Sequence, residues 1–298
     1  MELSVAEVTE RLRERAYLVD RGLATVIGVA LELGRPLLLE GEPGVGKTEC
    51  AKALAATLDV RLIRLQCYEG IDVASALYDW NHARQMLYIR TLEATHAAEL
   101  PVADVFGRDF LLRRPLLEAI EHDDPRPPVL LIDEIDRADD EFEAFLLELL
   151  SDFQATIPEI GTIRAQRPPV VVLTSNRTRD LHAALRRRCL YHWISYPSLE
   201  REVAIVQARL PEVPARLAHE VAQLVAALRE LDLEKAPGIA ETLDWVQALA
   251  ALGEQRLAPE LVDATLGSAL KHRDDLERAR ARDIGELVAA ARRAADER

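Results

Sequence analysis

The sequence predicts an α/β protein in which a parallel sheet lies between helices and a small all-helical domain follows. Apolar runs that begin near residues 36, 129 and 168 each end in small or polar residues, with helical patterns between them. Such alternation is typical of parallel strands joined by helices. From residue 200 onward, apolar residues recur only at helical spacing. We therefore expect a core domain in residues 1–198 and a helical domain in residues 199–298, with the boundary at Pro197 and Ser198.

Composition and charge narrow the class of protein. The 298 residues are 49% apolar and 30% charged, a balance typical of a helix-rich globular protein. Residues 199–298 hold 19 acidic and 14 basic side chains, so they carry −5 of the net −14 and residues 1–198 carry −9. Acidic charge in both parts opposes binding to a polyanion, so we expect no nucleic-acid partner.

Cysteine spacing and hydropathy indicate the compartment. Cys50, Cys67 and Cys189 form no CxxC pair, which predicts reduced, buried thiols. The first residues lack the apolar run of a signal peptide. No apolar run approaches the roughly 18 residues that a transmembrane helix needs. We expect no membrane span and a cytoplasmic location.

The segment "PLLLEGEPGVGKTECAKALAATL", residues 36–58, is the most informative. An apolar strand pattern precedes a loop that fits GxxxxGK[ST], and residues 51, 54, 55 and 58 then form one helical face. Backbone N–H groups of such a loop surround phosphate oxygens at a helix N-terminus. A lysine there reaches the β- and γ-phosphates, and the following hydroxyl ligates Mg²⁺.

The predicted ATP-binding residues are those of this loop: Gly41, Glu42, Pro43, Gly44, Val45, Gly46, Lys47 and Thr48. Thr48 is also a predicted Mg²⁺ ligand.

The two later apolar runs supply the remaining candidate residues. Residues 129–132 lead into Asp133 and Glu134, and residues 170–173 lead toward Asn176. Because the carboxyl ends of parallel strands converge on one crevice, these side chains should meet the phosphate loop. We expect Asp133 to bind the nucleotide's Mg²⁺ through water and Glu134 to polarise the attacking water. Asn176 would orient that water or contact the γ-phosphate.

Together these motifs resemble those of AAA+ ATPases. Within that group the chain is similar to the MoxR family, and most like its CoxD-type accessory ATPases, which serve maturation of molybdenum–copper carbon monoxide dehydrogenase. The likeness covers most of the chain and is carried by "RLQCYEGIDVASALYDWN", "FLLRRPLLEAI", "ATIPEIGTIRAQRPP", "LRRRCLYHWISYP" and "APGIAETLDW". The resemblance implies an AAA+ P-loop NTPase core with a helix-2 insert and a pre-sensor-1 hairpin, plus a small all-α lid.

The resemblance also bears on the run of arginines in "ALRRRC", residues 184–189. In AAA+ rings, an arginine from one subunit completes the ATP site of its neighbour and stabilises charge on the γ-phosphate. The family's finger segment aligns with Arg188, and Arg187 is the second candidate. The neighbour's nucleotide would then supply the anion for the cluster. The alternative is a solvated helix end, where cations offset the negative end of the dipole.

The implied activity is ATP hydrolysis, with Mg²⁺, by a chaperone-like homohexamer that remodels a client metalloenzyme. A von Willebrand A-domain protein is a candidate partner, because such proteins are common beside this family. Two other functions remain open: a DNA-acting AAA+ ATPase, and a scaffold that binds ATP but barely hydrolyses it. The acidic charge argues against the first. The presence of Glu134, Asn176 and Arg188 argues against the second.

Spacing predicts where the extra elements lie. The runs at residues 36 and 129 are some 90 residues apart, about 30 more than two strand–helix–strand units need. We place the surplus between Glu69 and Phe110, where residues 74–100 are helical in pattern. Two β-prone runs around residues 158–161 predict the hairpin. Both elements resemble those that face a ring pore and contact clients.

In the lid, helical patterns cover residues 200–209, 214–230, 239–252, 258–270 and 274–295. Many AAA+ lids carry a nucleotide-sensing arginine at the start of the third helix. The segment from Lys235 to Trp245 contains no arginine. Lys235 is the candidate replacement.

Overall fold

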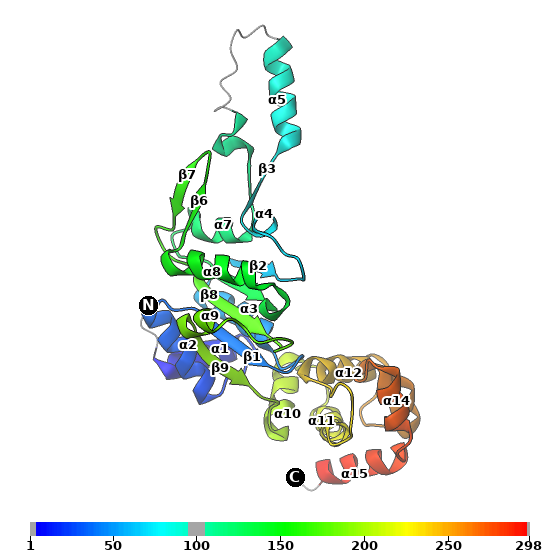
Figure 1. The fold of residues 1–298 in the computed structure, drawn as a ribbon. Helices are drawn as coiled ribbons and strands as arrows, with labels where there is room; N and C mark the ends of the chain where they lie inside the picture. The colour runs from blue at the N-terminus through cyan, green and yellow to red at the C-terminus, as the bar shows by residue number, and fades with distance from the viewer. Residues whose placement is uncertain (1–3, 95–104, 297–298) are drawn as a thin grey trace. The chain divides into compact units, whose positions relative to one another are not determined.

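A computed structural model describes residues 4–94 and 105–296 of the chain, and Figure 1 draws their helices and strands. The residues form two compact units. The first comprises residues 1–11, 20–40 and 50–193, and the second comprises residues 12–19, 41–49 and 194–298. The phosphate-loop segment thus groups with the C-terminal residues. The assignment of domains at residue 198 stays a prediction.

A five-stranded sheet with strand order β2-β5-β8-β1-β9 organises the N-terminal part (Figure 1). Its strands are β1 (Leu37–Gly41), β2 (Leu62–Gln66), β5 (Val129–Asp133), β8 (Val170–Ser175) and β9 (Leu190–Ile194). The pairs β2–β5, β5–β8 and β8–β1 are parallel. Every residue of β1 and β5 is buried, which explains their continuous apolar runs. This is the predicted α/β fold.

The parallel register brings the carboxyl ends of the strands level with one another. Gln66 lies opposite Asp133, and Leu39 lies opposite Thr174. Ile132 pairs with Leu173, so Asp133 and Thr174 follow on neighbouring strands. The residues that sequence places after three separate apolar runs therefore share one edge of the sheet.

Helices flank the sheet, and those within residues 115–188 bury an apolar cluster against it. The flanking helices are α1 (Val5–Glu14), α2 (Arg21–Leu33), α3 (Lys47–Leu58), α7 (Pro115–Ile120), α8 (Asp140–Asp152) and α9 (Ala183–Arg188), with the short 3₁₀ turn η2 (Ile135–Arg137) after β5. Helix α2 begins at an Asp20 cap that accepts from the Leu23 N–H at 2.7 Å, and it ends at Gly34 with φ of 62°. One face of this helix is buried, at Leu23, Ile27 and Ala30.

The insert between β2 and β5 is only partly helical. It contains α4 (Val73–Ala76), β3 (Tyr78–Trp80), α5 (His82–Ala94), the 3₁₀ turn η1 (Arg108–Phe110) and β4 (Leu111–Arg113). Strands β3 and β4 pair antiparallel. The prediction of a helical pattern over residues 74–100 is therefore wrong at residues 78–80, where pairing with a distant strand overrides local periodicity. Residues 95–100 of that prediction lie outside the described residues.

The predicted hairpin is confirmed. Strands β6 (Gln154–Ile157) and β7 (Gly161–Arg164) pair antiparallel. Gly161 begins the second strand with φ of 95°, a left-handed value that favours glycine. The hydroxyls of Thr156 and Thr162 lie 3.0 Å apart across the pair.

The C-terminal unit is helical beyond β9. Its elements are α10 (Leu199–Arg209), α11 (Ala215–Arg229), α12 (Ile239–Ala251), α13 (Pro259–Thr265), the 3₁₀ turn η3 (Leu266–Ser268), α14 (Arg273–Arg280) and α15 (Ile284–Asp296). Trp245 is fully buried in the core of this unit, and its indole N–H donates to the Thr265 hydroxyl at 2.8 Å.

Two of the helices predicted here are divided in the structure, and the first, at residues 258–270, is α13 followed by the 3₁₀ turn η3. The single helix predicted for residues 274–295 is two helices, because the helical conformation ends before Asp283. The Asp283 carboxylate then accepts from the Glu286 N–H at 3.0 Å and caps α15. None of the helices in residues 4–94 and 105–296 has the length and apolar character needed to cross a membrane.

Candidate functional site

The glycine loop leaves the carboxyl end of β1 and ends where α3 begins. Gly44 and Gly46 have φ values of 78° and 96°, a region open mainly to glycine. Lys47 is the first residue of α3 and its side chain is buried, 6% exposed. Its ammonium donates to the carbonyl oxygens of Gly41 and Glu42, both at 2.7 Å. The loop thus curls around its own lysine.

These features fit the phosphates of a nucleotide with Mg²⁺. A twelve-residue helix presents its N-terminus to the loop, left-handed glycines turn the backbone, and a buried cation lies inside the turn. Thr48 follows within the first turn of α3 and is partly buried. Its hydroxyl is the oxygen ligand this position would offer to Mg²⁺.

Asp133 and Glu134 occupy the end of β5. Asp133 is 1% exposed, and its carboxylate accepts from Arg64 at 2.6 and 3.0 Å. Glu134 has a left-handed φ of 55°, which turns its side chain out of the strand direction. The Glu134 carboxylate accepts from the Gln66 amide at 2.9 Å. Two neighbouring carboxylates are therefore held separately, by two residues of β2.

Thr174 joins the two carboxylate residues across the sheet. Its hydroxyl donates to Asp133 Oδ1 at 2.5 Å and accepts from the Glu134 backbone N–H at 2.9 Å. Sequence reasoning assigned no role to Thr174, Arg64 or Gln66. The signal that could have found them is the polar residue near the end of each predicted strand, since parallel strands align those ends.

Asn176 lies just beyond β8, in a turn organised by Asp136. The buried Asp136 carboxylate accepts from the N–H of Asn176 at 3.2 Å and from the N–H of Thr178 at 2.8 Å. Arg177 between them has φ of 57°. Within residues 4–94 and 105–296, the Asn176 side-chain amide makes no hydrogen bond. Its backbone is thus fixed two residues from Thr174, with the amide left available to a ligand.

The three arginines of α9 differ in their surroundings. Arg186 forms a forked ion pair with Glu40, with distances of 3.0 and 3.3 Å. Arg187 and Arg188 are exposed, and their guanidinium groups make no hydrogen bond or ion pair to any described residue. The expectation that a neighbour supplies the anion for the whole cluster is thus incorrect for Arg186, whose anion belongs to its own chain.

Electrostatics around the sheet make its thiols inert. All three cysteines are buried, and none forms a disulfide with a described residue, as predicted. Burial raises the pKa of Cys67 to about 12, and the carboxylates of Asp133 and Asp136 add to the shift. Burial also raises the pKa of Cys189 to about 12. Both stay protonated at neutral pH, so neither is a candidate nucleophile.

The start of α12 packs on the phosphate loop within the C-terminal unit. The Ala240 N–H donates to the Gly44 carbonyl at 3.3 Å. Glu241 accepts from the Gly238 N–H at 2.9 Å and lies beside Gly44. Lys235 is exposed, and its backbone N–H donates to Asp275 at 3.1 Å. The loop therefore meets backbone and a carboxylate here, where many AAA+ lids place an arginine.

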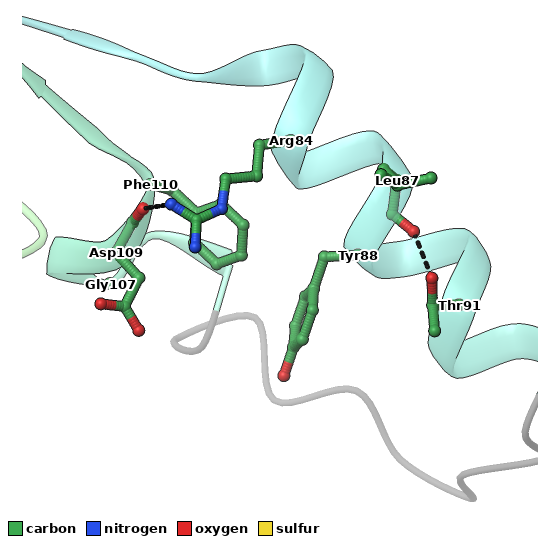
Figure 2. A pocket seen from close by; sticks show the side chains of 7 residues that line it. All are labelled: Arg84, Leu87, Tyr88, Thr91, Gly107, Asp109 and Phe110. Carbon is green, nitrogen blue, oxygen red and sulfur yellow. Dashed lines mark hydrogen bonds between the residues drawn. The ribbon is translucent and has the colours of Figure 1, made fainter.

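A cavity of about 560 Å³ lies on the insert, between α5 and the turn at η1 (Figure 2). The Arg84 guanidinium lies 5.6 Å from the centre of the Phe110 ring and donates to the Asp109 carbonyl at 2.8 Å. The Tyr88 and Phe110 rings are 5.3 Å apart. This cavity contains none of the predicted site residues.

Comparison with known proteins identifies the family. The sequence model of the AAA family, "ATPase family associated with various cellular activities", matches residues 37–194. The Lon protease of Mycolicibacterium smegmatis is 27% identical in an alignment 276 residues long, which covers 87% of this chain and 32% of that protein. The chain therefore spans about a third of that relative.

Two solved structures of the RuvB Holliday junction branch migration motor of Thermotoga maritima are also similar. One is 18% identical, covers 90% of this chain and 71% of its own, and has a TM-score of 0.45. A mutant of that protein is 20% identical, covers 92% and 74%, and has a TM-score of 0.48. The family assignment does not depend on these scores. It follows from the family match, which takes in both strand-end carboxylates, the phosphate loop and α9: the chain belongs to the AAA family of ATPases.

Proposed function

We propose that this AAA protein hydrolyses ATP and uses the cycle to remodel a client protein in the cytoplasm. The observation that carries the proposal is the edge of the sheet where β5, β8 and β1 end. There Thr174 joins Asp133 to Glu134, and β1 leads directly into the phosphate loop. A phosphate loop that follows one strand, with a metal ligand and a base at the end of another strand of the same sheet, supplies the groups that phosphoryl transfer to water needs.

The residues divide the work by their chemistry. Loop N–H groups and Lys47 would bind the phosphates, while Thr48 and Asp133 would hold Mg²⁺. The metal, when bound, neutralises charge on the β- and γ-phosphates. Glu134 would accept a proton from the attacking water, and Asn176 would orient that water with an uncharged amide. Preorganisation by Thr174 and Gln66 keeps both carboxylates in place before the nucleotide arrives.

The arginines at the end of α9 support a site shared between subunits. Arg35, just before β1, donates to the carbonyl oxygens of Arg187 and Arg188. The phosphate loop begins at the other end of β1, about 16 Å away for a five-residue strand at roughly 3.3 Å per residue. The carbonyl groups of Arg187 and Arg188 thus lie near the start of β1, and their guanidinium groups are exposed. We propose that Arg188, with Arg187 second, acts on the ATP of a neighbour in a homohexamer.

The finer proposal concerns the client. The sequence resemblance to MoxR proteins, and to CoxD-type ATPases among them, suggests maturation of a metalloenzyme of the molybdenum–copper carbon monoxide dehydrogenase type. A von Willebrand A-domain protein would be the candidate partner. The insert and the β6–β7 hairpin would contact the client. A protein trapped with ATP in native cells, followed by identification of what copurifies, would test this assignment.

The test of ATP hydrolysis uses two matched variants. Glu134→Gln keeps the size of the side chain but removes the base, so it should bind ATP and hydrolyse it at least ~100-fold more slowly. Lys47→Ala removes a phosphate contact and should weaken ATP binding in calorimetry. Unchanged affinity in the lysine variant would contradict the phosphate-loop assignment. A wild-type protein that binds ATP without turnover would instead favour the scaffold.

A further inference from the structure

Arg186 differs from its two neighbours in α9 because it is tied to the strand that leads into the phosphate loop. Its guanidinium reaches both oxygens of Glu40, at 3.0 and 3.3 Å. Glu40 is 1% exposed and is the residue before Gly41. The same guanidinium lies 5.4 Å from the centre of the Tyr191 ring. A fork of two charge-assisted bonds fixes orientation as well as distance.

A second contact holds the same last turn of α9. Arg35 donates to the carbonyl of Arg187 at 2.9 Å and to that of Arg188 at 3.0 and 3.2 Å. Arg35 and Glu40 flank the two ends of β1. The last turn of α9 is therefore bonded to residues near both ends of β1. The side chains of Arg187 and Arg188 in the same turn are exposed.

The helix depends on these contacts for its position. With six residues, α9 is far shorter than the roughly 12–15 residues at which isolated helices become even marginally stable. Tertiary contacts must therefore determine where its last residues lie. Leu185 supplies a buried apolar anchor, but an apolar contact restrains direction less than a forked ion pair does.

We propose that Glu40 and Arg186 are positioning residues that place Arg188 for the ATP site of the neighbouring subunit. This inference rests on the proposed function, since it assumes that Arg188 acts in trans. Neither residue of the pair would contact the nucleotide. The competing role is local: because Glu40 precedes Gly41, the pair could instead support its own phosphate loop.

The substitutions that test this proposal must leave the protein folded. Changing Arg186 alone would leave a buried carboxylate without its partner, which is strongly destabilising. Replacing both residues, as Glu40→Met with Arg186→Met, removes the pair without an unpaired charge and is often tolerated. The matched control removes an exposed pair in the C-terminal unit, Arg280 with Asp263, at 2.7 Å, by the same double change to Met.

The double variant should bind ATP with unchanged affinity in calorimetry, and its ATPase kcat should fall by about 10²-fold, the scale of a misplaced catalytic group. The control pair should leave kcat unchanged. Arg186→Lys, which keeps the charge but not the fork, should give an intermediate kcat. A double variant with full kcat would overturn the proposal.

Mixing experiments separate the two roles. Glu134→Gln subunits offer an intact finger without a base, and Arg188→Ala subunits offer an intact site without a finger. The double variant should regain ATPase activity when mixed with Glu134→Gln subunits and should not when mixed with Arg188→Ala subunits. Recovery with Arg188→Ala subunits but not with Glu134→Gln subunits would show that the Glu40–Arg186 pair supports the ATP site of its own subunit. Recovery with neither would show a role in folding. Either result would overturn the inference.

The proposed function has its own control in the same experiment. Arg188→Ala mixed with Glu134→Gln should recover activity, in rings shown to exchange subunits. If this mixture stays inactive, the shared site itself fails. If it recovers while the double variant alone has normal kcat, only the positioning role fails.

Discussion

At the scale of single residues, the hydroxyl of Thr174 links the two carboxylate residues of the candidate site. It is 1% exposed and bonds to both residues at the end of β5. Asp133 is further held by Arg64, and Glu134 by Gln66. Side chains that bind metal and activate water are effective only when their geometry is already correct before reaction. Thr174 contacts both of these residues.

Thr174→Val tests this at constant shape. Valine leaves the Glu134 N–H and one oxygen of Asp133 without this partner, at a cost of about 1–3 kcal/mol in the free energy of unfolding. We expect a lower kcat for ATP hydrolysis because both carboxylates lose a common restraint. Steady-state kinetics and denaturant unfolding measure the two effects. Thr156→Val, at an exposed position on the hairpin, is the control. Equal kcat values for the two variants would refute the role.

At the scale of elements, the contact between the phosphate loop and α12 is made by backbone. A Cβ added to Gly238 would lie 2.8 Å from the Gly44 Cα and 2.9 Å from the Pro43 carbonyl oxygen. The φ of Gly238 is −88°, a value that alanine adopts freely. A substitution there would therefore act through crowding alone. The start of α12 therefore contacts the phosphate loop directly, without an arginine side chain between them.

Gly238→Ala should push α12 and the loop apart and weaken ATP binding, since overpacking of this kind costs about 1–3 kcal/mol. That cost corresponds to roughly a 5- to 150-fold loss of affinity if the bound state bears all of it. Calorimetric titration with ATP measures it. Gly267→Ala is a matched control, because a Cβ there has no atom within 4 Å. An affinity equal to that of the control would show that the contact is unimportant for binding.

At the scale of the whole molecule, charge bears on the choice of partner. The chain carries −14 overall, and the excess of acidic residues extends over both its N- and C-terminal parts. Some of its exposed arginines are paired with carboxylates, as in Arg61 with Glu118 and Arg280 with Asp263, whereas Arg187 and Arg188 are not. Paired cations release few counterions when a polyanion approaches. On the net charge, we still expect no nucleic-acid partner.

We expect no measurable binding to duplex or single-stranded DNA at physiological salt. Fluorescence anisotropy over a salt series would check this, with the wild-type protein and the ATP-bound Glu134→Gln variant side by side. The second protein matters because assembly with ATP could create a surface that the single chain lacks. Tight binding with a steep salt dependence in either protein would favour the DNA-acting function.

The sequence by itself determined the elements whose information is local. The glycine loop, the apolar runs of β1, β5 and β8, the β6–β7 hairpin and most helices of the C-terminal unit follow from short-range patterns. Each such pattern can be read from residues that are close together in the sequence. Motif chemistry supplied the roles expected of Lys47, Asp133, Glu134 and Asn176, and family resemblance supplied the role expected of Arg188.

Only the tertiary structure decided which distant residues meet. Thr174 contacts Asp133 across 41 positions of sequence, and Arg186 reaches Glu40 across 146. The strand β3 forms because residues 111–113 pair with it, against a local helical pattern. Strand order and register set these meetings, and neither is encoded in a short window. The arginine run could thus be recognised from sequence. Only the fold showed that Arg186 pairs with Glu40 whereas Arg188 is exposed.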